Sequence, residues 1–138
     1  MVDEPNNPKI LLVSPDLLST SRIAGLARPL PARVETLRSL EEEPRDGPFD
    51  LVLVDLQALA GDPAVIVSGV AKLIERQAAA TGRTAKLVAF GPHVHKDRLA
   101  EAVAAGADAA VSRGELLGSF LGLVRRWLDA DGTGVTGG

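Results

Sequence analysis

A run of four branched apolar residues at 51–54 constrains the fold of this chain more than any other feature. The run is too short for a helix, and it offers no polar side chain to solvent. It therefore predicts a strand that is buried on both faces of a parallel sheet. Asp55 follows this strand directly. In an open parallel α/β sheet, binding groups collect beyond the carboxyl ends of the strands, so Asp55 is either part of a site or a loop cap.

Short apolar segments alternate along the chain with segments of helical periodicity, which indicates about five βα units. The predicted strands are 9–13, 32–37, 51–54, 86–90 and 109–111. The predicted helices are 17–27, 64–80, 96–105 and 115–128, with a short helical turn or no helix between the second and third strands. This order predicts an α/β fold with a doubly wound, flavodoxin-like sheet of five parallel strands in the order 2-1-3-4-5. We expect a flexible N-terminus at 1–8, one domain at 9–128 and a disordered tail at 129–138.

The composition argues against several classes of protein. The 138 residues suffice for one domain with a core, and the net charge of -3 argues against a nucleic-acid surface. The absence of cysteine excludes disulfides and thiolate metal sites and fits a cytoplasmic protein. No apolar run approaches the roughly 18 residues that cross a bilayer, and the acidic N-terminus lacks the features of a signal peptide.

The predicted strand order brings the ends of strands one, three, four and five to a common crevice. Here the chain resembles the receiver domains of two-component response regulators, over roughly residues 9–128. The resemblance rests on the βα units, on the segment Phe-Asp-Leu-Val-Leu-Val-Asp that ends at Asp55, and on Ala-Ala-Gly-Ala-Asp at 104–108. It implies that Asp55 stands where receivers accept a phosphoryl group from a histidine kinase.

The resemblance also shows where this chain departs from the family. Receivers hold Mg²⁺ with an acidic pair after the first strand, and they contact the phosphoryl oxygens with a Ser or Thr after the fourth strand and a Lys after the fifth. The corresponding residues here are Ser14 and Pro15, Gly91, and Arg113, while Asp16 lies one position too late for the acidic pair.

These departures predict a pseudo-receiver that is not an enzyme and needs no cofactor. Asp55 and Asp16 are a poor ligand set for Mg²⁺, which prefers near-octahedral oxygen coordination. Without the metal, the charge of a transferring phosphoryl group is not neutralised. We therefore expect Asp55 to pair with Arg113 or to cap a loop.

The expected function is binding to a protein partner, such as a histidine kinase or an output protein, with a twofold homodimer as a further option. The family uses the region that corresponds to residues 96–128 for such contacts, so we expect Arg98, Glu101 and Arg125 to be exposed there. Two alternatives remain open. One is a working phosphoacceptor that uses Asp55 with Mg²⁺, and the other is a flavodoxin-like domain that binds a small molecule or nucleotide.

Overall fold

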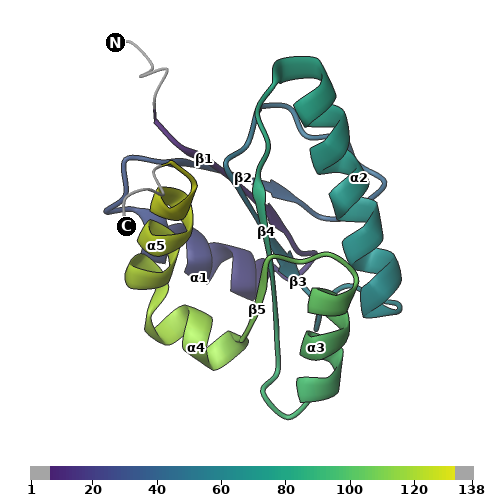
Figure 1. Cartoon of the computed structure of the whole chain (residues 1–138). Helices are drawn as coiled ribbons and strands as arrows, with labels where there is room; N and C mark the ends of the chain where they lie inside the picture. The colour runs from purple at the N-terminus through teal and green to yellow at the C-terminus, as the bar shows by residue number, and fades with distance from the viewer. Residues whose placement is uncertain (1–6, 133–138) are drawn as a thin grey trace.

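Five parallel strands form the centre of the molecule in the computed structural model, which describes residues 7–132 (Figure 1). The strands are β1 (Lys9–Val13), β2 (Arg33–Leu37), β3 (Leu51–Asp55), β4 (Lys86–Gly91) and β5 (Ala109–Ser112). They pair in the order β2-β1-β3-β4-β5, and every pair is parallel. The predicted fold class and strand order are confirmed, and β2 and β5 are the two edge strands.

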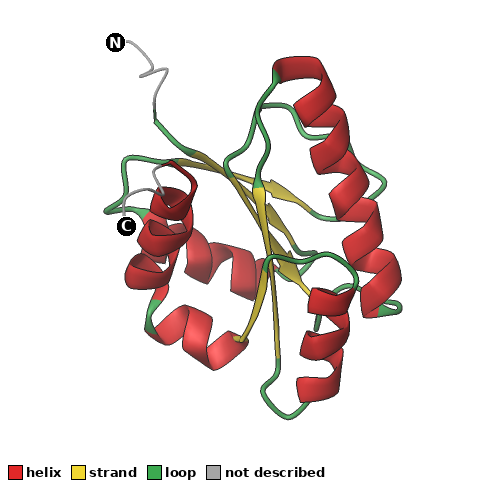
Figure 2. Cartoon of the chain, viewed as in Figure 1, coloured by secondary structure: helices red, strands yellow, loops and turns green. Residues whose placement is uncertain are grey.

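Helices cover both faces of the sheet (Figure 2). They are α1 (Leu17–Ala27), α2 (Pro63–Thr81), α3 (Lys96–Ala104), α4 (Arg113–Gly118) and α5 (Phe120–Gly132). The side chains of α1, α4 and α5 pack with one core cluster, and those of α2 and α3 pack with the other. Local signals set the helix ends: Asp62 caps the start of α2, and Gly82 ends it with a φ of 77°.

The central strand β3 joins the two cores. Leu51 and Leu53 belong to the cluster beneath α1 and α5, whereas Val52 and Val54 belong to the cluster beneath α2 and α3. All four side chains are fully buried. This alternation is what the uninterrupted apolar run predicted, because a strand covered on both faces has no side chain left for solvent.

No helix lies between β2 and β3, as the sequence allowed, and polar contacts hold the connecting loop instead. The Gln77 side chain of α2 accepts a hydrogen bond from the Phe49 backbone N–H (2.7 Å) and donates to the Phe49 carbonyl (3.0 Å). At the other end of the loop, the Glu35 carboxylate accepts hydrogen bonds from the backbone N–H groups of Arg45 and Asp46. The loop is thereby fixed to β2 on one side and to α2 on the other.

Three details differ from the predictions. The last helix is broken at Ser119, which has non-helical dihedrals and follows Gly118, and Gly/Ser pairs are common sites of helix breaks. The second part, α5, continues to Gly132 and so includes the first residues of the predicted tail. Val103 was predicted to point inward but is 48% exposed. The predictions for residues 1–6 and 133–138 lie outside the described residues.

Within the described residues, none of the helices is both long enough and apolar enough to cross a membrane.

The contacts of Gln77 predict a measurable loss of stability in Gln77→Met, which keeps the shape of the side chain but none of its hydrogen bonds. The N–H of the buried Phe49 then has no acceptor, and we expect the free energy of unfolding to fall by about 1–2 kcal/mol in urea denaturation. Arg76→Met, at the exposed neighbouring position, is the control and should change stability by less than about 0.5 kcal/mol. Equal unfolding midpoints for the two variants would contradict this account of the loop.

Candidate functional site

The carboxylate of Asp55 lies at the carboxyl end of β3 and is completely buried. Its Oδ2 accepts a hydrogen bond from the Ser14 hydroxyl at 2.8 Å, and Ser14 is itself fully buried. Its Oδ1 accepts from the backbone N–H groups of Gln57 and Ala58, both at 3.1 Å. Both carboxylate oxygens therefore have partners within the chain, and none of these partners is a cation.

Ser14 fixes this arrangement from the end of β1. Its backbone N–H donates to the Leu37 carbonyl of β2 (2.9 Å), which holds the residue in line with the sheet. Its hydroxyl donates to Asp55 and also accepts a hydrogen bond from the backbone N–H of Asp16 (3.1 Å). A hydroxyl can do both because it is a donor and an acceptor, whereas a carboxylate at this position would repel Asp55.

Asp16 does not join Asp55. Its Oδ1 accepts from the Leu18 backbone N–H (3.3 Å), and its Oδ2 accepts from the Ser19 hydroxyl (2.6 Å), so it caps α1. The hydrogen bond from Ser19 is the main cause that lowers the pKa of Asp16 from its ordinary value, and the positive charge of Arg113 adds a smaller effect. The Asp16 carboxylate is therefore directed to the start of α1 and not to Asp55.

The predicted pairing of Asp55 with Arg113 is wrong, whereas the predicted loop cap is present in the bonds to Gln57 and Ala58. Arg113 begins α4, and it forms no hydrogen bond or ion pair with the described residues. Its charge acts on Asp16 instead. Gly91 ends β4 and pairs with Ser112 of β5, so no hydroxyl stands at this strand end.

Arg98 was predicted to be an exposed partner residue, and this is also wrong. Its guanidinium Nη2 donates to the carbonyl oxygens of Leu56 (3.1 Å) and Gly61 (3.4 Å), and the side chain is half-buried. Arg98 thus fastens α3 to the loop that follows Asp55. Sequence periodicity could not show this contact, because it joins a side chain to backbone atoms about forty residues away. Glu101 and Arg125 are exposed as predicted.

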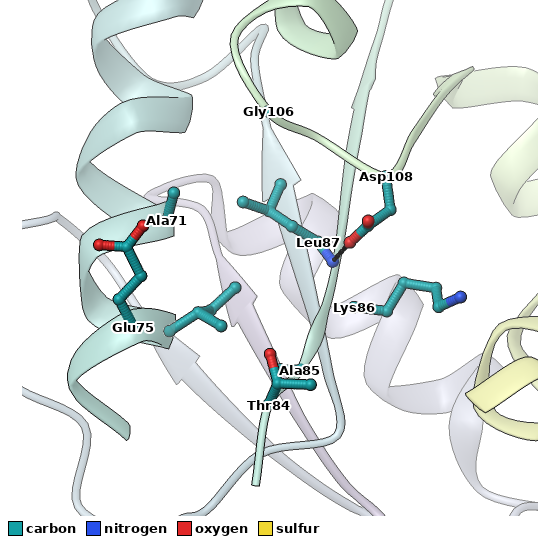
Figure 3. A pocket seen from close by; sticks show the side chains of 9 residues that line it. Ala71, Glu75, Thr84, Ala85, Lys86, Leu87, Gly106 and Asp108 are labelled. Carbon is teal, nitrogen blue, oxygen red and sulfur yellow. Dashed lines mark hydrogen bonds between the residues drawn. The ribbon is translucent and has the colours of Figure 1, made fainter. Parts of the chain in front are cut away.

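Two surface hollows are candidates for a ligand site. One of about 370 Å³ lies beside the Arg98 contact and is lined by Leu56, Gln57, Leu59, Gly61, Pro92, His95 and Arg98. The other, of about 340 Å³, lies between α2 and the start of β4 (Figure 3). It is therefore at the amino ends of the strands, whereas Asp55 lies at a carboxyl end. Figure 3 shows the Asp108 carboxylate turned to the backbone of Leu87. It accepts a hydrogen bond from the Leu87 N–H at 2.8 Å.

Neither hollow has the features of a cofactor site. Both are open, and the carboxylate of Asp108 and the guanidinium of Arg98 are engaged by backbone groups. Among the described residues, no group of three or more His, Asp or Glu side chains is arranged to hold a metal ion. The residues that correspond to the receiver metal site do not fit Mg²⁺, because Ser14 and Pro15 supply no carboxylate and Asp16 is engaged at α1.

Sequence comparison finds no matching family model and no matching curated protein. Comparison of structures gives many matches, and receiver domains of response regulators are among them. A CheY-like receiver domain from Methanospirillum hungatei aligns with a TM-score of 0.71 at 17% identity, over 90% of this chain and 95% of that chain. The chemotaxis response regulator CheY4 of Vibrio cholerae aligns with a TM-score of 0.67 at 17% identity, over 89% and 100%.

A third similar structure is the receiver domain of the Saccharomyces cerevisiae response regulator Ssk1, which was crystallised with the histidine phosphotransfer protein Ypd1. It aligns with a TM-score of 0.71 at 12% identity, over 94% of each chain. At these identities the similarity establishes the fold and not the activity. The chain has the fold of the CheY-like response-regulator receiver domains.

Proposed function

We propose that this protein is a receiver-like signalling module that binds a protein partner and does so without Mg²⁺-dependent phosphorylation of Asp55. The observation that carries the proposal is the complete burial of Asp55, with both oxygens engaged by Ser14 and by backbone N–H groups. A phosphoryl donor must reach a carboxylate oxygen in line with its leaving group. Here that approach first requires the bond to Ser14 to break.

The electrostatics of the crevice support the same proposal. Transfer of a phosphoryl group depends on cations that neutralise its oxygens. In this crevice the position of the metal ligands is taken by Ser14 and Pro15, and Arg113 is the cation nearest in sequence to the end of β5. Arg113 alone is a weak substitute, because a guanidinium does not reproduce the geometry of an ammonium group together with a metal ion.

The surface formed by α3, β5, α4 and α5 is the best candidate for the partner contact. All four residues of β5 are partly exposed, although they belong to the central sheet. Beside them, α3 presents Glu101 and the apolar side chain of Val103, and α5 presents Arg125. A surface with exposed apolar groups and charges at its margin is typical of transient protein contacts.

The kind of partner is suggested by a structural neighbour. The yeast Ssk1 receiver domain binds the phosphotransfer protein Ypd1, so a two-component signalling protein, either a histidine kinase or an output protein, is the partner class that we propose here. The absence of cysteine is compatible with the cytoplasmic location that such a role implies.

The direct test is a titration of the protein with Mg²⁺, and then with Mg²⁺ and beryllofluoride, which mimics a phosphoryl group. We expect no saturable change in Trp127 fluorescence or in the amide NMR shifts around Asp55 at millimolar Mg²⁺. Asp55→Asn is the control, because it keeps the size of the side chain and removes the acceptor charge. Saturable shifts that disappear in Asp55→Asn would establish a working phosphoacceptor and refute the proposal.

Ser14→Ala tests whether the hydroxyl is the group that satisfies the buried carboxylate. The substitution removes the bond to Asp55 Oδ2 and the acceptor of the Asp16 N–H, so we expect a loss of about 1–3 kcal/mol in the free energy of unfolding. Ser21→Ala on the exposed surface of α1 is the matched control and should change it by less than about 0.5 kcal/mol. If both substitutions had the same small effect, Ser14 would not be holding Asp55.

Metal binding should be recoverable if the missing carboxylates are its only obstacle. The double variant Ser14→Asp with Pro15→Asp places two carboxylates beside Asp55, where their mutual repulsion favours a bound cation. Mg²⁺ at ten times its dissociation constant would add about 1.4 kcal/mol to the stability of this variant, and it should leave the wild type unchanged. Thermal unfolding with and without Mg²⁺ measures the difference, and an equal response of both proteins would show that the wild-type crevice already binds the metal.

A further inference from the structure

The edge strand β2 leaves the backbone groups of every second residue unpaired. Its first and last residues both bond to β1, through the Arg33 N–H at 3.0 Å and the Leu37 carbonyl at 2.9 Å. Residues of a strand face its two sides alternately, so the residues between these two that share their direction also face β1. The N–H and C=O groups of Val34 and Thr36 therefore point away from the sheet, and no partner for them lies within residues 7–132.

The outer side of β2 is accessible to another strand. The loop after β2 is held at the Glu35 carboxylate, which projects from a face of the sheet and not from its edge. A hollow of about 580 Å³ borders the second half of the strand, between residues 35–38 and residues 42, 43 and 45 of the loop. Thr36 is exposed there, and the strand contains no proline that would prevent further pairing.

The two charged residues of β2 indicate which strand can pair with it. Charges on an edge strand usually oppose pairing, but Arg33 and Glu35 have opposite signs and project from the same face, two residues apart. If two copies of β2 pair antiparallel about a twofold axis at Val34, each Arg33 lies opposite the Glu35 of the other copy. An axis at Glu35 would instead oppose two carboxylates. The charges therefore favour a second copy of this strand in one register.

Hydrogen bonding is compatible with that register. In an antiparallel ladder, a hydrogen-bonded pair of residues exchanges two N–H···O bonds, so both members need outward backbone groups. Val34 on the axis meets this condition with its own copy. The outward N–H of Thr36 then lies opposite Ala32 of the other copy, on each side of the axis.

Both charged groups can take a further partner. The Arg33 guanidinium lies 3.8 Å from the Asp46 carboxylate, and the Arg33 side chain is 52% exposed. Each oxygen of the Glu35 carboxylate accepts one backbone N–H of its own chain, at 2.7 and 2.9 Å. A carboxylate oxygen can accept two hydrogen bonds, and a guanidinium can donate five. The contacts within one copy therefore leave room for an ion pair across the axis.

We propose that two copies of this protein associate through antiparallel pairing of their β2 strands about a twofold axis at Val34, so that one continuous sheet runs through the dimer. β2 and β5 are the opposite edges of the sheet, so this dimer leaves the surface of α3, β5, α4 and α5 free at both of its ends. The inference goes beyond the function proposed above and does not depend on it.

Sedimentation equilibrium with two charge variants tests the register. Arg33→Glu alone and Glu35→Arg alone each place like charges opposite each other on both sides of the axis, so we expect the dissociation constant of each homodimer to rise by about tenfold or more. Mixed in equal amounts, the two variants again oppose unlike charges and should form a one-to-one heterodimer. Arg126→Glu, an equal change of charge on α5, which packs over β4, is the control and should dimerise like the wild type.

A second variant tests the backbone bonds and leaves both charges and the loop unchanged. Thr36→Pro removes an outward N–H from each copy and keeps the ladder with β1, so we expect it to weaken the dimer, and circular dichroism verifies that it folds. In the wild type, the amides of Val34 and Thr36 should exchange with solvent more slowly as the protein concentration rises.

Three results would overturn the proposal. They are a wild type that stays monomeric at millimolar concentration, a homodimer whose dissociation constant is unchanged in the folded Thr36→Pro variant, and folded charge variants that do not associate with each other. None of these measurements involves Mg²⁺ or beryllofluoride, so a failure here is distinguishable from a failure of the proposed function.

Discussion

The hydrogen bond from the Ser14 hydroxyl to the buried Asp55 carboxylate determines how the carboxyl edge of this sheet is built. A buried carboxylate is costly unless each oxygen has a donor, and here the donors are one hydroxyl and two backbone N–H groups. The same contacts fix the loop after β3 through its N–H groups, while Arg98 fixes that loop through its carbonyl oxygens at Leu56 and Gly61. The segment is therefore held from both sides without any ligand.

Elsewhere in the fold, polar contacts hold the connection between β2 and β3, which contains no helix. The loop between β2 and β3 contributes Phe49 to the core, but it is otherwise held by Gln77, by Glu35 and by the ion pair of Asp50 with Arg83. These contacts bind mainly backbone atoms. They give the loop a defined path at little cost in apolar surface, which a chain with only 3% aromatic residues has to use sparingly.

The fold was predictable because it depends on periodicity, and most of the site was not, because it depends on contacts between distant residues. The apolar run at 51–54 and the alternation of strand and helix patterns were sufficient for the strand order. The sequence also showed directly that Ser14 and Pro15 replace the acidic pair that receivers carry after the first strand. The pairing of Asp55 with Arg113, the exposure of Arg98 and the burial of Val103 were predicted wrongly. Each depends on the direction of a side chain, which spacing along the chain does not specify.

The contact of Arg98 has a consequence for how the loop after β3 keeps its shape. Its two acceptors are the backbone carbonyls of Leu56 and Gly61, so the contact uses no side-chain atom of the loop. The bonds from Gln57 and Ala58 to Asp55 also use backbone N–H groups only. The shape of such a loop therefore rests on hydrogen bonds that do not depend on the side chains of the loop residues.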